Sequence, residues 1–442
     1  MLFNSHIFML LFLPLLLAGW YFLNWKKKFQ LAQGYLIGMS LWFYAYANLQ
    51  YLWLLLFSCL IGWLLSCLPE KIFSEKGKKV LTGVGCVFHL GLLGYFKYSN
   101  FFLENLNTVF HTDFPMLQIL LPVGISFYTF QQLAYLIDRC RGDAPRDSFF
   151  DYLTFMVYFP QLLQGPILLR SEFMGQLKEP ERRRFHAERF SEGIQFFVFG
   201  LAKKVLLADT LAKAVNYGYS NVSMLDSISA LLLAVGYLTE LYFDFSGYCD
   251  MAVGLGKMIG LEVAENFDAP FHSASVKEFW RRWHMTLGRF FTRYVYIPLG
   301  GNRRGKMRTL CNVMIVMLLS GLWHGAAWTF VLWGFLHGVG MIWDNLEHPH
   351  LPKKWMRQAA TFAYVCMTFV FFRAESIAQG IDVLKSIVSL KWNGFVFQMA
   401  SALDMTECYM ITKALSMKLP GLLSWFWLGI FVVLIAICVR VL

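Results

Sequence analysis

The stretch FDAPFHSASVKEFWRRWHMTLGRFFTRYVYIPLGGNRRGKMR, residues 267–308, leads into an apolar run of 34 residues at 310–343. Inside that run lies GLWHGA, which carries a histidine at position 324. A run of this length can cross a bilayer, where a titratable ring is costly unless it has a hydrogen-bonding partner or a chemical task. His324 is therefore the first residue to consider as functional.

The composition is typical of an integral membrane protein. Of the 442 residues, 57% are hydrophobic and only 15% are charged, whereas soluble domains carry about 25% charged residues. The net charge is +11, but Lys and Arg fall in short clusters between apolar runs, which indicates membrane topology and no nucleic-acid partner. Nine scattered cysteines without a C-x-x-C pair predict neither a disulfide framework nor a metal site.

Apolar runs of about 20 residues are long enough to cross the hydrocarbon core. They predict an all-α, multi-pass membrane protein that folds as one domain, residues 1–442, with about eleven crossings. The predicted spans besides 310–343 are 7–23, 31–47, 51–67, 80–96, 116–137, 194–215, 228–245, 359–372 and 422–439, with a weaker run at 377–390.

Two apolar runs are predicted to be interrupted. A continuous helix over 310–343 would be about 50 Å long, against about 30 Å for one crossing. Gly321 and Gly325 are therefore expected to mark a break, which would place His324 at a helix junction. The run 152–169 contains two prolines and a glycine, so we expect a re-entrant segment shielded by protein. The basic amphipathic stretch 171–190 is expected at the cytoplasmic interface.

The charged loops predict the orientation in the membrane. Basic loops end at Lys28, Lys79 and Arg146, whereas the alternate loops 48–50 and 99–114 contain no Lys or Arg. By the positive-inside rule the basic loops are cytoplasmic and the N-terminus is extracytoplasmic. The N-terminal stretch lacks the features of a signal peptide, so we expect it to be retained as the first span.

Two of the ten histidines, His284 and His324, lie where they could do chemistry. His324 could instead be a core imidazole bonded to a backbone carbonyl, although its flanking glycines would let a substrate approach. The segment of His284 could instead anchor the chain at the cytoplasmic face through Arg281 and Arg282.

Other polar residues also lie in or beside apolar sequence. Glu240, Asp244 and Asp250 each need a hydrogen-bonding partner or a wet cavity there. The basic loop 296–308 is either an ordinary cytoplasmic loop or a patch that recruits a phosphorylated acyl carrier. The sequence has no G-x-S-x-G, Walker A or H-E-x-x-H motif, so a hydrolase, an ATP-driven pump or a metalloprotease is unsupported.

Six motifs resemble those of the membrane-bound O-acyltransferase (MBOAT) family, and within it the alginate O-acetyltransferase type. They are spread in the family's order over more than half of the chain. The motifs are PVGISFYTFQ (122–131), YFPQLLQGPI (158–167), FDFSGYCDMAVGLGKMIG (243–260), FWRRWHMTL (279–287), YIPLGGNRRG (296–305) and GLWHGAAWTFVLWGFLHG (321–338).

The resemblance implies about eleven membrane helices around a central tunnel, with His324 as the essential histidine and His284 as a second conserved polar position. The chain departs from the family's usual pattern at Thr292 and Arg293, where Arg and Asp are common. A role for that pair is therefore not carried over. The substrate-tunnel candidates are Trp323, Asp244, Ser246, Asn302, Trp280 and Arg281.

The resulting hypothesis is a membrane O-acetyltransferase of the bacterial plasma membrane. It would move an acetyl group from a cytoplasmic thioester, acetyl-CoA as co-substrate with no bound cofactor, toward an extracytoplasmic alginate- or cellulose-like polysaccharide. The resemblance implies an extracytoplasmic SGNH-like esterase partner within a polysaccharide synthesis or export complex, surrounded by membrane lipids.

Two alternatives remain. One is a D-alanyl transferase of teichoic acid that uses a carrier-protein thioester, although that branch usually lacks the PLGGNR motif found here. The other is a transporter or flippase with Asp244 on its substrate pathway, which predicts inverted repeats that the sequence lacks.

Overall fold

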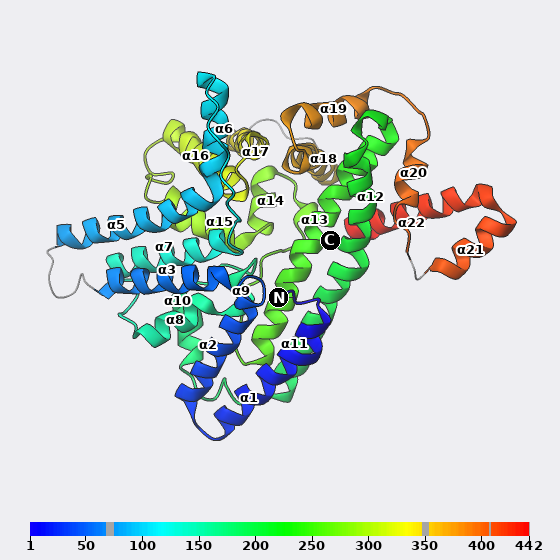
Figure 1. Cartoon of the computed structure of the whole chain (residues 1–442). Helices are drawn as coiled ribbons and strands as arrows, with labels where there is room; N and C mark the ends of the chain where they lie inside the picture. Colours follow the sequence, from blue (N-terminus) through cyan, green and yellow to red (C-terminus); the bar gives the residue numbers. More distant parts are fainter. Residues whose placement is uncertain (68–74, 347–352, 406–407, 442) are drawn as a thin grey trace. The chain divides into compact units, whose positions relative to one another are not determined.

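The computed structural model describes residues 1–67, 75–346, 353–405 and 408–441, and its regular elements are helices (Figure 1). Strand-like pairing among these residues amounts to an isolated bridge between Phe267 and Trp283. Five helical segments of the described chain are long and apolar enough to cross a membrane: Phe8–Trp25, Gln50–Cys67, Lys76–Phe110, Ser227–Met258 and Lys306–His324. The prediction of an all-α membrane protein is confirmed.

The number of crossings stays a prediction. Helices α2 (Phe29–Ala45) and α7 (Ile125–Arg141) have 17 residues each, one fewer than the shortest of the five segments above. Tilt, flanking residues and local bilayer thinning let such helices cross as well.

Contacts divide the chain into two compact units. Unit 1 consists of Met1–Gly200, Tyr248–Glu265 and Thr292–Tyr294, and unit 2 consists of Leu201–Gly247, Asn266–Phe291 and Val295–Leu442. Helix α13 (Ser227–Met258) contributes residues to both units.

Unit 1 is built from helices that follow one another closely in the sequence. They are η1 (Phe8–Phe12), α1 (Leu13–Trp25), α2 (Phe29–Ala45), α3 (Gln50–Cys67), α5 (Glu75–Leu93), η2 (Gly94–Tyr98), α6 (Ser99–Phe110), α7 (Ile125–Arg141), α8 (Phe149–Val157), α9 (Phe159–Leu162), α10 (Arg170–Leu177) and most of α11 (Ala187–Ala202).

Long-range contacts join the first and second segments of unit 1. Trp20 of α1 donates its indole N–H to the carbonyl of Ile259, at 3.1 Å. Helix α11 crosses the end of α13 at two glycines, since a Cβ at Gly254 would lie 2.5 Å from the carbonyl oxygen of Gly193. Small residues at such crossings let membrane helices approach closely.

The predicted span 116–137 is wrong in its first half. Residues 112–124 are not helical, and α7 begins only at Ile125. Pro122 has no N–H to continue a helix. Gly124 adopts a left-handed φ of 76°, and a Cβ there would lie 2.3 Å from the carbonyl oxygen of Leu162. Hydrophobicity alone does not report these backbone constraints.

The predicted interruption of 152–169 is confirmed. Helix α8 ends at Val157, the single turn α9 follows, and the chain is then irregular up to α10. A Cβ at Gly165 would lie 2.0 Å from the carbonyl oxygen of Pro160, so the folded-back chain requires glycine at this position.

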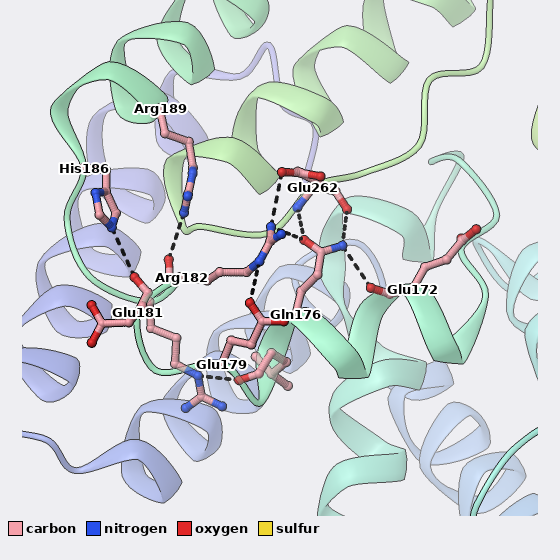
Figure 2. Close-up of polar contacts among 10 residues, drawn as sticks. Glu172, Gln176, Glu179, Glu181, Arg182, His186, Arg189 and Glu262 are labelled. Carbon is pink, nitrogen blue, oxygen red and sulfur yellow. Dashed lines mark hydrogen bonds and ion pairs between the residues drawn. The ribbon is translucent and has the colours of Figure 1, made fainter.

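The basic stretch after α10 is held by a polar network (Figure 2). Arg182 donates to Glu179 at 2.9 Å, and to Gln176 and Glu262 at 3.2 Å each. The neighbouring Arg183 is 5% exposed and donates to the carbonyl of Phe29 at 3.2 Å. Part of the basic charge in this stretch therefore stabilises unit 1.

Unit 2 contains the remaining helices. They are η3 (Lys203–Ala208), α12 (Asp209–Ser220), η4 (Val222–Met224), the first part of α13, η5 (Pro270–His272), α14 (Val276–Arg282), α15 (Met285–Phe291), the end of η6 (Thr292–Tyr296), α16 (Lys306–His324), α17 (Trp328–Asn345), α18 (Lys354–Arg373), α19 (Ile377–Val388), α20 (Phe395–Ser401), α21 (Tyr409–Lys418) and α22 (Pro420–Val441).

Helix α13 begins at a buried polar cap. One oxygen of Asp226 accepts from the Ser229 N–H at 2.8 Å, and the other accepts from the N–H groups of Asn393 and Gly394 at 3.1 Å each. Such a cap satisfies one of the helix's unbonded N–H groups. It also joins α13 to the turn before α20.

The predicted break in the run 310–343 is confirmed. Helix α16 ends at His324, Gly325 is extended with φ −161° and ψ 152°, and α17 begins at Trp328. The two helices then pack side by side (Figure 1). At their crossing, a Cβ at Gly321 would lie 2.3 Å from the carbonyl oxygen of Phe330, and one at Gly334 would lie 2.4 Å from that of Met317.

We predict that Gly334→Ala lowers stability by about 1–3 kcal/mol, because the added methyl group must push two backbones apart. Thermal unfolding of the detergent-solubilised protein measures the effect. Gly429→Ala in α22 is the matched control, since a Cβ there meets nothing within 4 Å. Equal melting temperatures for Gly334→Ala and wild type would show that the close crossing is not required.

Candidate active site

His324 lies at the end of α16 within a shell of aromatic rings. Its ring centroid is 4.9 Å from that of Trp323, 5.2 Å from that of Trp333 and 5.1 Å from that of Phe372. All three contacts are edge-to-face, the arrangement that aromatic quadrupoles favour. The shell holds an imidazole in surroundings where electrostatic interactions are stronger than in water.

His284 lies between α14 and α15 and comes close to His324. The two ring centroids are 6.4 Å apart, and the His284 ring is 4.7 Å from that of Phe245. His284 is 1% exposed and has a left-handed φ of 47°. A non-glycine residue in a sparsely populated backbone region costs on the order of 1–3 kcal/mol and is often found at functional sites. The two histidines singled out in the sequence thus lie together in unit 2.

Asn266 fixes the orientation of His284. Its Oδ1 atom accepts from the Thr286 N–H at 3.0 Å, from the Thr286 hydroxyl at 3.0 Å, and contacts His284 Nδ1 at 3.2 Å. Because a backbone N–H can only donate, the shared atom is the amide oxygen, and Nδ1 of His284 must carry a proton to bond to it. In the neutral ring, Nε2 is then the nitrogen with the lone pair.

Sequence reasoning missed Asn266. It lies 18 residues before His284, outside any motif with a recognisable ligand or catalytic spacing. It is 2% exposed, and a buried asparagine beside a histidine is visible only once the chain is folded.

The aromatic candidates from the sequence lie in or beside the shell. Trp323 is 7% exposed and contacts His324 directly. Trp280 of α14 has its ring centroid 5.6 Å from that of Trp333, which itself contacts His324. Trp280 is thus one ring removed from the central imidazole.

The remaining candidates lie elsewhere in unit 2. Asp244 pairs with Lys204 at 2.5 Å, and that lysine also pairs with Asp209 at 2.8 Å. Ser246 is 1% exposed, and its hydroxyl has no hydrogen-bond partner among the described residues. Arg281 and Asn302 are exposed, so the structure does not bring these two residues into the ring shell.

The basic loop 296–308 is a glycine turn that presents its charges outward. Gly300, Gly301 and Gly305 all have positive φ, and the basic side chains between 303 and 308 are exposed. Asn312 is fully buried and donates to the carbonyl of Gly301 at 2.9 Å. Asn312 is therefore an asparagine that secures this turn.

The described residues contain no group of three or more His, Cys, Asp or Glu side chains that could hold a metal ion. The chemistry that the site can support is proton transfer by imidazole and hydrogen bonding to a polarised substrate. Helical membrane segments and a histidine pair beside aromatic rings agree with a membrane enzyme.

The family is shown by comparison with known proteins. Residues 141–380 match the family model of MBOAT, the membrane-bound O-acyltransferase family. The chain belongs to this family and is an acyltransferase. It is 35% identical over 423 residues to the peptidoglycan O-acetyltransferase of Helicobacter pylori, covering 88% of this chain and 80% of that protein.

Two further relatives place the chain within the family. The probable alginate O-acetylase AlgI of Azotobacter vinelandii is 39% identical over 389 residues, covering 85% of this chain and 76% of that protein. The teichoic acid D-alanyltransferase of Bacillus subtilis is 28% identical over 271 residues, covering 57% of this chain and 69% of that protein. The resemblance to O-acetylating members is thus both stronger and more extensive.

We predict that Asn266→Ala lowers the acyltransferase kcat at least about tenfold, because His284 loses the acceptor that fixes its tautomer. Thr286→Val is the matched control, since it removes one donor to Asn266 but keeps the backbone N–H and the contact with His284. Steady-state assays of protein that still elutes as a folded monodisperse species distinguish the two variants. Equal losses in both would indicate a purely structural role for the network.

Proposed function

We propose that this protein takes an acetyl group from acetyl-CoA on the cytoplasmic side and passes it across the membrane for O-acetylation of an extracytoplasmic polysaccharide. The observation that carries the proposal is the 6.4 Å separation of the His284 and His324 rings at a helix break. In a relative of O-acetylating enzymes, such a pair supports acyl transfer better than transport.

His324 is proposed to act as the general base. An imidazole titrates near working pH, and His324 lies at the end of α16, immediately before the extended Gly325. The acceptor hydroxyl would lose its proton to His324 as its oxygen attacks the thioester carbonyl. His284, held by Asn266, would orient the thioester or stabilise developing charge.

The acceptor is proposed to be a polysaccharide or the hydroxyl of a partner that delivers the acetyl group to one. By their names, two of the relatives act on peptidoglycan and on alginate. Both polymers carry sugar hydroxyls, so the relatives support a sugar hydroxyl as acceptor, but they do not indicate one particular polymer. An extracytoplasmic SGNH-like esterase partner would fit a relay of this kind. D-alanyl transfer is less well supported because its relatives match little more than half of this chain.

Acetyl-CoA is proposed as the donor on electrostatic grounds. The exposed cations Arg303 and Arg304 lie in the glycine turn after η6, and the exposed Lys306 begins α16. A cluster of this kind attracts phosphate groups and raises the rate of encounter with an anionic ligand. The same patch would also suit a phosphorylated carrier.

The proposed orientation places the N-terminus outside and the exposed turn at 26–28 in the cytoplasm. We predict that protease added to intact spheroplasts removes an epitope tag placed before Met1. A tag inserted in the turn at 26–28 should be protected until the membrane is opened. The opposite pattern of protection would show that the N-terminus is cytoplasmic. It would then place the basic loop 296–308 on the extracytoplasmic side, away from the proposed donor.

We predict that His324→Ala lowers acetyl transfer by roughly 10²- to 10⁴-fold, the usual contribution of a positioned base. The measurement is transfer of labelled acetyl from acetyl-CoA to the cell-envelope polymer in membrane vesicles. His186→Ala is the matched control, because that histidine is exposed in unit 1. Normal acetylation in a folded His324→Ala protein would rule out its role as base.

A further inference from the structure

Two neighbouring tryptophans of the site differ in whether the indole N–H has a hydrogen-bond partner. Trp280 of α14 and Trp333 of α17 have ring centroids 5.6 Å apart. Each indole has one N–H donor and no acceptor. Inside a membrane protein, such a donor is expected to find an acceptor in the protein, in water or in a ligand.

The Trp280 donor is fully used. Its Nε1 atom donates to Nδ1 of His337 at 3.2 Å. The other nitrogen of the His337 ring, Nε2, is 2.9 Å from the Thr368 hydroxyl. Because indole can only donate, Nδ1 is the acceptor and Nε2 carries the proton. The Thr368 hydroxyl accepts that proton and donates its own to the carbonyl of Val365 at 2.8 Å.

His337 was not among the candidate residues predicted from the sequence. It accepts the hydrogen bond that holds the Trp280 indole. It is fully buried, and its ring centroid lies 4.8 Å from that of Trp333. The chain of hydrogen bonds from Trp280 to Val365 fixes two rings that pack against Trp333.

The Trp333 donor has no partner among the described residues. Trp333 is 1% exposed, its Nε1 atom is buried without a hydrogen bond, and its ring borders His324 at 5.2 Å. Phe369 and Phe372, with centroids at 5.5 Å and 5.0 Å, also border it and offer no acceptor. A buried donor left unpaired costs about 1–3 kcal/mol, and a phenylalanine would fill this aromatic core without that cost.

We propose that the Trp333 N–H is the hydrogen-bond donor to the carbonyl oxygen of the acyl group under transfer. This inference rests on the proposed function of His324. A preorganised donor in a water-poor site stabilises charge that develops in the transition state, and its own desolvation has already occurred on folding.

The acceptor oxygen bonds to the carbonyl carbon while its proton passes to His324, and the carbonyl π electrons move onto oxygen. The Trp333 N–H bonds to that oxyanion. When the intermediate collapses, the C–S bond breaks, the C=O bond re-forms, and the leaving thiolate takes the proton from the His324 imidazolium.

The kinetic test replaces Trp333 in the full-length protein by phenylalanine and by benzothienylalanine, in which sulfur replaces the N–H within the same bicyclic shape. We expect kcat for acetyl transfer from acetyl-CoA to fall on the order of 100-fold in both variants. KM should change less than about threefold, because the lost interaction is specific to the transition state. Trp427→Phe, at a core tryptophan of α22 that is 5% exposed, controls for loss of an indole from the same unit.

A spectroscopic test needs no turnover. Acetyl-CoA labelled at the acetyl carbonyl is bound to His324→Ala protein, and the carbonyl stretch is compared with that in the same protein carrying benzothienylalanine at 333. A hydrogen bond from Trp333 predicts a lower stretching frequency when the indole is present.

The outcomes separate the two proposals. If wild type transfers acetyl and His324→Ala does not, the proposed function stands. A kcat for the benzothienylalanine variant within twofold of wild type, or identical carbonyl frequencies, then overturns the role of Trp333 alone. If wild type fails to transfer acetyl, the proposed function fails, and the carbonyl comparison still decides whether Trp333 donates to an acyl oxygen.

Discussion

The structure of unit 2 depends on a helix that ends inside the apolar sequence. In lipid, a helix end leaves carbonyl groups without partners, so it must be shielded by neighbouring protein. Here the short extended link at 325–327 turns the chain back, and the glycine crossing at Gly321 and Gly334 brings α17 alongside α16. The break thereby places an imidazole, rather than an aliphatic side chain, against three aromatic rings, in a residue that is only partly buried.

Polar groups in this shell are of two kinds: some have a hydrogen-bond partner in the protein, and one has none among the described residues. His284 and His337 are each fixed through one ring nitrogen by a partner of known polarity, an amide oxygen in the first case and an indole N–H in the second. Their tautomers therefore follow from the donor and acceptor rules. Trp333 is different, because its donor is buried and unpaired among the described residues. Preorganised groups of both kinds are what acyl transfer requires, since reorganising them during the reaction would raise the barrier.

Much of the fold could be predicted from apolar length and breaker residues. The length of the run 310–343 forced a division, and Gly325 marked its place, so the position of His324 at a helix end followed from the sequence. The start of α7 did not, because a left-handed Gly124 and the proline before it end an apolar run that hydropathy treats as continuous.

The site was predicted less completely than the fold. Motifs identified His284 and His324 because each follows a tryptophan in an unusual context, and His324 also precedes a glycine. Asn266 and His337 act through hydrogen bonds to residues 18 and 57 positions away, a relation that no local pattern contains. Asn302 was a candidate because it belongs to a motif, whereas the buried Asn312 lies outside the motifs and is identified only by its burial in the structure.

The central claim is that the His324 ring touches the acyl group under transfer. The most direct measurement is an electron cryomicroscopy structure of the full-length protein with a thioether analogue of acetyl-CoA that cannot release its acyl group. The account predicts density for the acyl carbonyl beside the His324 ring. Density for the acyl group elsewhere, with the ring of residue 324 enclosed by packed side chains on all sides, would contradict it.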